Sequence, residues 1–318
     1  MRSTLINKSN LTRMVAVIRF KMRSHINGYR SLLQWGLFIL FLFPIEFLSA
    51  QPFEVIVSRF SIQSVEKVTY DLDAGECSDP EFFASASFFT HGLAHCPNGQ
   101  VFGWKTPPPM DGLYLLDEIN GEFIFYSSIP AGLPPITLGL ICLEDDIFIV
   151  RSSDSYHKVD LIQDTIINLP PTGYGDNPIT TWNATGMTLM NGKGYRPFND
   201  TLTPSNIGIV EFDPLDPSNS SLVVETGGIP DYVSGLAPTP HCNILIGSAG
   251  GLIWGDKSAW VFNVATGDFY KLCDYDLDRN IRQMTTAYEH EEQDCHLLIN
   301  LDYLEESDAP EYDYLNPE

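Results

Sequence analysis

The sequence predicts an all-β fold made of repeated units of four short strands, preceded by an export signal. Three observations support this prediction: a glycine-containing phrase recurs at a nearly constant spacing, paired apolar segments flank turn-forming dipeptides, and a basic and apolar leader opens the chain. The 318 residues include 22 prolines and 24 glycines, and no long stretch has the 3.6-residue period of an amphipathic helix. Helical repeats are therefore disfavoured.

The first 50 residues are expected to form a secretory signal. They contain seven basic residues and one acid, and residues 35–43 (WGLFILFLF) form an apolar run ahead of the small-residue segment Leu48–Gln51. This order matches the n-region, h-region and cleavage site of a signal peptide, and the apolar run is short for a bilayer span. Met22 is an alternative start, and an uncleaved anchor over residues 32–50 is the alternative to cleavage. Residues 51–65 are assigned to a leader strand or linker.

The exported part of the chain is strongly acidic. The whole chain has 18 basic and 41 acidic residues, so removing those of the leader leaves 11 basic and 40 acidic residues and a net charge of about −29. Such a surface repels nucleic acid and anionic membranes. We therefore expect a secreted or cell-surface monomer that binds no nucleic acid and touches no membrane beyond its N-terminal signal or anchor.

The repeat has a period near 47 residues. The phrases HGLA, LGLI, TGMT and SGLA contain Gly92, Gly139, Gly186 and Gly235, and one further step reaches RQMT at residues 282–285. Each copy continues through a polar turn into a second apolar segment and then into a second hairpin. The clearest second hairpins are residues 112–126 around Asn120-Gly121 and residues 259–272 around Thr266-Gly267, with less regular copies at 156–169 and 207–224. Four short strands per unit at this period predict a β-propeller.

The two ends of the repeat region predict how the ring closes. Residues 68–75 look like an outer hairpin without an inner one, and residues 284–301 look like an inner hairpin whose second strand is 295–301. Half a blade, four blades and half a blade make five four-stranded blades, closed by pairing of N- and C-terminal segments. The propeller is expected over residues 66–303, with an acidic tail at 304–318. A fragment of a larger ring is the alternative.

Two phrases carry a family resemblance. Residues 92–103 (GLAHCPNGQVFG) and 113–117 (LYLLD) resemble the blades of secreted or cell-surface bacterial β-propeller proteins of the Bacteroidetes type, which often lie N-terminal to adhesion or sorting modules. The resemblance covers roughly residues 66–303 and implies a fold, without implying a reaction.

Cysteines and acidic residues provide further candidates. All six cysteines follow the leader, where an oxidising compartment favours disulfides. Cys273 is a candidate partner of Cys295, and Cys77 is the alternative partner of Cys295. Asp274, Asp276 and Asp278 alternate as calcium ligands do, but Arg279 stands where an EF-hand needs glycine. We therefore expect no cofactor, with calcium as the alternative.

The expected function is non-catalytic binding or scaffolding, with a glycan, a peptide or a surface protein recognised over the central channel. The positions just before the repeat glycines should approach the axis at one mouth of the ring, so His91, Asp231 and Arg282 are the candidate ligand-binding residues. The His-Cys pairs at 95–96 and 241–242 occupy similar places in the repeat, which favours a structural role over a catalytic dyad.

Two other functions are considered. An extracellular glycoside hydrolase-like enzyme needs two carboxylates about 5–10 Å apart. The mouth positions contain no carboxylate, and Asp231 is the acid nearest to them in the sequence. The third hypothesis is a structural spacer from a larger adhesin.

Overall fold

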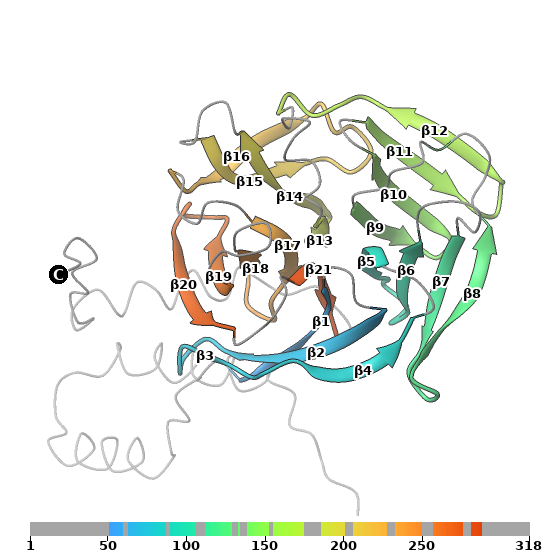
Figure 1. Ribbon diagram of the computed structural model, residues 1–318. Helices are drawn as coiled ribbons and strands as arrows, with labels where there is room; N and C mark the ends of the chain where they lie inside the picture. Colours follow the sequence, from blue (N-terminus) through green and yellow to red (C-terminus); the bar gives the residue numbers. More distant parts are fainter. Residues whose placement is uncertain are drawn as a thin grey trace, which may run out of the picture. The chain divides into compact units, whose positions relative to one another are not determined.

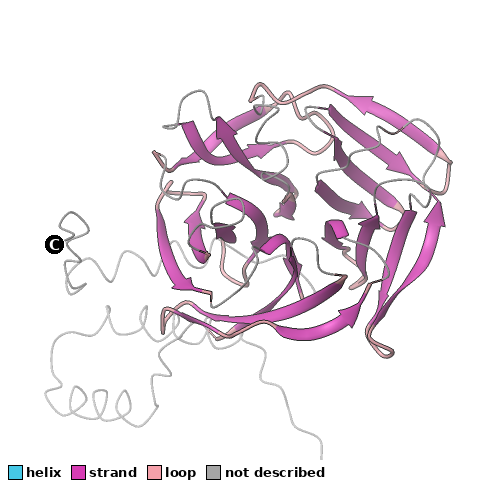
Figure 2. Ribbon diagram, viewed as in Figure 1, coloured by secondary structure: helices cyan, strands magenta, loops and turns pink. Residues whose placement is uncertain are grey.

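The computed structural model consists, in its described part, of strands and the turns that join them (Figures 1 and 2). The description covers residues 51–59, 63–86, 90–105, 112–128, 133, 139–152, 155–174, 186–200, 206–227, 233–249, 257–275 and 281–287. The leader 1–50 and the tail 304–318 lie outside the described residues. Within the described residues, no helix is long and apolar enough to cross a bilayer.

Three sheets each contain four consecutive antiparallel strands. The first consists of β9 (Gly139–Glu144), β10 (Ile147–Ser152), β11 (Ser155–Asp160) and β12 (Thr165–Leu169). The second consists of β13 (Thr188–Met190), β14 (Lys193–Asp200), β15 (Asn206–Phe212) and β16 (Ser220–Glu225). The third consists of β17 (Val233–Pro238), β18 (Ile244–Ala249), β19 (Ser258–Asn263) and β20 (Phe269–Asp274).

The remaining strands form a nine-stranded sheet with two parts. One part contains β5 (Thr90–His95), β6 (Val101–Lys105), β7 (Gly112–Asp117) and β8 (Glu122–Ser128). The other contains β21 (Ile281–Thr286), β1 (Phe53–Arg59), β2 (Ser64–Asp71) and β4 (Glu81–Ser85), with β3 (Glu76–Cys77) paired to β2. A single parallel pairing, Ser85 with Glu122, joins the two parts. Each part is therefore a four-stranded group like the other sheets.

The outer hairpins form where turn chemistry predicts them. Gly121 and Gly267 adopt positive φ angles of 66° and 84°, which glycine reaches without steric cost. Each glycine donates its N–H back across the turn, Gly121 to the Asp117 carbonyl at 2.9 Å and Gly267 to the Asn263 carbonyl at 2.8 Å. The predicted hairpins at 112–126 and 259–272 are thus confirmed as β7–β8 and β19–β20.

The closing group differs from the expected two-plus-two arrangement. β21 supplies the innermost strand, and β1, β2 and β4 supply the other three. β1 pairs with β21 on one side and with β2 on the other, so it takes the position expected for 295–301. The reason is that β1 (FEVIVSR) is an apolar strand whose Val55 and Val57 are fully buried in the core between sheets. Residues 295–301 lie outside the described residues.

The innermost strands of the described groups form a closed ring. β5 contacts β9, β9 contacts β13, β13 contacts β17, β17 contacts β21, and β21 contacts β5. The repeat glycines permit this close approach, because a Cβ on Gly186 would lie 2.6 Å from the Cα of Gly235, and one on Gly92 would lie 2.8 Å from the Cβ of Leu140. Figure 1 shows the sheets extending outward from these strands. The described fold is therefore all-β and propeller-like, as the repeat predicts.

The core lies between neighbouring sheets. In one cluster Ile141 and Ile149 of β9 and β10 pack with Met187 and with Phe212 of β15.

Because consecutive strands are antiparallel, the turns after the first and third strand of every sheet lie at one end of the ring, which we call the turn end. The other end, where the inner strands begin, is the loop end.

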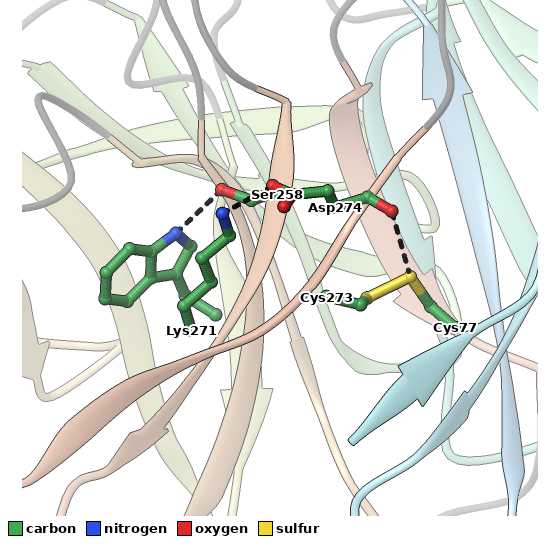
Figure 3. Close-up of polar contacts among 6 residues, drawn as sticks. Cys77, Ser258, Lys271, Cys273 and Asp274 are labelled. Atoms are coloured by element: carbon green, nitrogen blue, oxygen red, sulfur yellow. Dashed lines mark hydrogen bonds and ion pairs between the residues drawn. A yellow bond between two sulfur atoms is a disulfide. The ribbon is translucent and has the colours of Figure 1, made fainter. Parts of the chain in front are cut away.

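Disulfides join neighbouring groups. Cys77 of β3 is bonded to Cys273 of β20, with Cα atoms 6.0 Å apart (Figure 3), and Cys96 is bonded to Cys142. Cys242 is disulfide-bonded as well. Neither predicted partner of Cys295 bonds to it. Cys77 and Cys273 bond to each other instead, because β3 lies against β20. Cys295 itself lies outside the described residues. The disulfides indicate an extracytoplasmic location.

Candidate functional site

A cavity of about 230 Å³ lies among the inner strands and opens toward the turn end. Every inner strand contributes to its wall, and so do the turns that follow β5 and β13. In β5, β17 and β21 the contributing residues lie in the carboxyl-terminal halves of the strands and include His95, Pro238 and Thr286. We call it the central cavity.

Tight turns bring the rim of the cavity together. Between β13 and β14, Asn191 and Gly192 both have positive φ, 52° and 73°, which is the conformation of a two-residue type I′ hairpin turn. After β5, the Cys96 carbonyl accepts the N–H of Gly99 at 3.0 Å, and the Cys96 N–H donates to the Gln100 carbonyl at 2.8 Å. The sequences NG and CPNG thus keep these turns short and close to the axis.

The wall combines apolar and polar groups. Leucine, isoleucine and methionine side chains contribute to it together with Thr188, Asn191, Thr285, Thr286 and His95. Among the lining residues of the described part there is no Asp, Glu, Lys or Arg. The inner strands pair with a neighbour on one side within the described sheets, so their other edges offer backbone N–H and C=O groups toward the axis. Near the loop end some of these groups are used: the Gly186 N–H donates to the Ser234 carbonyl at 2.6 Å, and the Ile281 carbonyl accepts from the Ser234 hydroxyl.

Of the predicted ligand-binding residues, Arg282 is the one whose side chain the structure describes, and it is not among the described residues of the wall. His91 lies near the start of β5, where its side chain is outside the description, and Asp231 lies outside the described residues. Arg282 is the second residue of β21, is 9% exposed, and has its pKa lowered to about 10 by burial. Ser234, at the equivalent position of β17, is buried and donates a hydrogen bond to the Ile281 carbonyl at 2.6 Å. Ser234 and Arg282 therefore lie at the loop end.

The sequence nevertheless contained a signal for the cavity. The polar turns after two inner strands, Pro97-Asn98-Gly99 and Asn191-Gly192, contribute residues to the wall at the turn end. Those turns follow the inner strand, whereas the sequence interpretation concentrated on the residues before the repeat glycine. The direction of each inner strand along the axis decides which of the two sets borders the cavity.

The calcium and nucleophile candidates have other roles in the described part. Asp274 forms an ion pair with Lys271, with Nζ and Oδ1 2.6 Å apart (Figure 3). Asp276 and Asp278 lie outside the described residues. No three His, Cys, Asp or Glu residues of the described part gather as metal ligands. Cys96 and Cys242 are both in disulfides, so neither His-Cys pair holds a thiolate nucleophile.

Two acidic groups at the turn end are held by hydrogen bonds. The Asn120 side chain donates to Asp117 at 2.7 Å, and this bond, with the Asn120 backbone N–H, lowers the pKa of Asp117. Tyr126 donates to Asp146 at 2.6 Å, which raises the pKa of Tyr126 to about 12. Asp117 therefore stays ionised at neutral pH, and the Tyr126 hydroxyl keeps its proton.

Comparison with known proteins adds one likeness. No family model matches the chain, and no curated protein matches it in sequence. Solved structures do match, among them the crystal structure of a nidogen–laminin complex, with a TM-score of 0.48 and 12% identity over 76% of this chain and 100% of that chain. A likeness at this level carries no inference about ligand or partner.

Proposed function

We propose that this chain is a five-bladed β-propeller that works outside the cytoplasm as a non-catalytic binding module and holds its ligand in the central cavity. The ring of inner strands supports the blade number, because the contacts return from β21 to β5. The disulfides support a secreted or surface-exposed protein, since such bonds persist in oxidising compartments.

The observation that carries the binding role is the central cavity itself. It is concave, it is formed by paired strands, and it combines an apolar wall with a few polar groups, which is the usual composition of a ligand pocket. The hydrolase alternative needs a carboxylate pair, and the described wall of this cavity supplies none. Binding of a glycan, a peptide or a surface protein is therefore favoured over catalysis.

The proposal can be tested by closing the cavity. Asn191 is an exposed rim residue in the β13–β14 turn, so Asn191→Trp places a large side chain at the opening. Asn243→Trp is the matched control, because Asn243 has a similar positive φ of 60° in the β17–β18 turn and is not part of the wall. Circular dichroism would establish that both variants fold.

The assay is NMR-detected titration of the full chain with uncharged probes, N-acetyl-phenylalaninamide and a neutral monosaccharide. We expect saturable binding of at least one probe by the natural protein and by Asn243→Trp, and a loss of at least tenfold in affinity in Asn191→Trp. Absence of binding by all three proteins would refute the proposal. Turnover of a polysaccharide panel that is abolished by Asp231→Asn would instead establish the hydrolase.

A further inference from the structure

The turn end carries many exposed carboxylates, most of them in the outer hairpin turns. Among the described inner turns, the β9–β10 turn holds exposed acids, Glu144 and Asp145. The outer turns add Asp73, Glu76, Glu118, Glu122, Asp164, Asp216 and Asp268. Within the described turns of this end the basic residue is Lys193. His241 is half-buried there, and burial lowers its pKa, opposed in part by Asp73, so it is neutral at pH 7. The turn end thus presents a strongly negative surface.

Basic residues of the described part concentrate at the opposite end. Arg59, Lys105 and Arg151 lie at or next to the ends of β1, β6 and β10, where these strands reach the loop end. Lys257 precedes β19 and Arg282 opens β21, also at the loop end. The loop end also holds acids, the exposed Glu225 and Asp274 and the Glu66 that pairs with Arg59, so its described charge is mixed while that of the turn end is negative. A partner that approaches the turn end is attracted if it is basic and repelled if it is acidic.

The central cavity favours an uncharged group, whereas the turns around it favour positive charge. A charged group entering it would lose its water without meeting an opposite charge in the described wall, which is unfavourable. Its volume of about 230 Å³ is below the roughly 300–1,000 Å³ of pockets for drug-sized ligands. An apolar side chain meets leucine, isoleucine and methionine in the wall, and its flanking peptide groups meet the open strand edges.

We propose that the occupant of the central cavity is a single uncharged, apolar residue presented by a basic segment of a partner protein. This inference rests on the proposed binding function and adds the chemistry of the partner. The apolar residue supplies the contact inside the cavity. The flanking lysines or arginines supply long-range attraction to the acidic turns, which speeds association and excludes acidic competitors.

The probes are three acetylated and amidated heptapeptides. The first is Lys-Lys-Gly-Phe-Gly-Lys-Lys, the second replaces all lysines by glutamate, and the third replaces phenylalanine by serine. Binding of each to the full chain is measured by calorimetry at low salt and at 1 M salt, where the Debye length falls to about 3 Å. We expect the first peptide to bind at least tenfold more tightly than either of the others, and to weaken at high salt.

Two pairs of variants locate the contact. Glu144 and Glu225 are both exposed and each ends its strand, but Glu144 ends β9 at the turn end and Glu225 ends β16 at the loop end. Glu144→Gln should weaken the lysine peptide roughly twofold to fivefold, the range of one surface charge pair, and Glu225→Gln should not. Asn191→Trp should abolish binding of the same peptide, and Asn243→Trp should preserve it.

The outcomes separate this inference from the proposed function. If the lysine and glutamate peptides bind equally, or if Glu225→Gln weakens binding as much as Glu144→Gln, the proposal of a basic partner is refuted. The proposal that the cavity binds a ligand is unaffected by either result. If the serine peptide binds as well as the phenylalanine peptide, the apolar occupant is refuted. If no peptide and no neutral probe binds the natural protein, both proposals fail.

Discussion

The disulfide between Cys77 and Cys273 links the first and last parts of the ring, so its removal tests how closure is stabilised. It spans 196 residues, whereas the Cys96–Cys142 disulfide spans 46. A disulfide stabilises the fold largely by restricting the unfolded chain, and the effect grows with the logarithm of the loop length. On that scale the long loop contributes roughly 5 kcal/mol and the short one roughly 4 kcal/mol.

The perturbation is the double variant Cys77→Ser/Cys273→Ser, with Cys96→Ser/Cys142→Ser as the matched comparison. Total stabilities of domains are about 5–15 kcal/mol, so either loss is a large share. Urea unfolding followed by tryptophan fluorescence should show both midpoints lowered, with the Cys77/Cys273 variant less stable than its comparison by about 1 kcal/mol. In the presence of a reductant, all three proteins should unfold at similar urea concentrations.

The reasoning would be refuted if the Cys77/Cys273 variant were as stable as the natural protein, or clearly more stable than the Cys96/Cys142 variant. Either result would mean that ring closure is already enforced by the other contacts of the last group. Those contacts are the β1–β21 ladder and the core around Val55 and Met284. If the natural protein unfolded at the same urea concentration with and without reductant, the reasoning would be refuted independently.

Three further outcomes are expected. Gly186→Ala should lower the free energy of unfolding by about 1–3 kcal/mol in chemical denaturation, because its Cβ would lie 2.6 Å from the neighbouring inner strand; Gly173→Ala, with nothing within 4 Å, should change it by less than about 0.5 kcal/mol. Tyr275→Phe should lower the free energy of unfolding by about 1–3 kcal/mol, because it leaves the buried Tyr70 hydroxyl without its 2.6 Å partner. An equal loss in Tyr126→Phe, at the surface, would contradict this. Burial raises the pKa of both Tyr70 and Tyr275, so their contribution to stability is complete below about pH 10, the pKa of an unfolded tyrosine, and is lost as the pH rises above it. Absorbance of these tyrosinates at alkaline pH should therefore appear together with loss of the β-sheet circular dichroism; normal titration in an intact fold would refute it.

Much of the architecture is readable from the sequence because it depends on local chemistry. Asn120-Gly121 and Thr266-Gly267 specify their hairpins through the turn conformations that these residues favour. The recurring Gly92, Gly186 and Gly235 mark where inner strands approach too closely for a Cβ. A period of about 47 residues then predicts a ring of four-stranded units, and the described sheets have that order.

The composition of the closing group was not readable in the same way. Residues 53–59 and residues 295–301 are both short apolar segments, and each satisfies the pattern of a strand next to β21. The pattern of one segment contains no information about which competing segment pairs with a distant strand. β1 takes that position in the folded chain, where both of its edges are hydrogen-bonded.

The sequence by itself determined the all-β repeat, its hairpins, the excess of acidic residues and the cysteines available for pairing. Tertiary structure alone decided that Cys77 meets Cys273, that β1 completes the last group, and that the turns after the inner strands border the central cavity. The physical reason is the same in each case. Strands and turns are set by interactions over a few residues, whereas partners across the ring meet only when closure brings distant segments together.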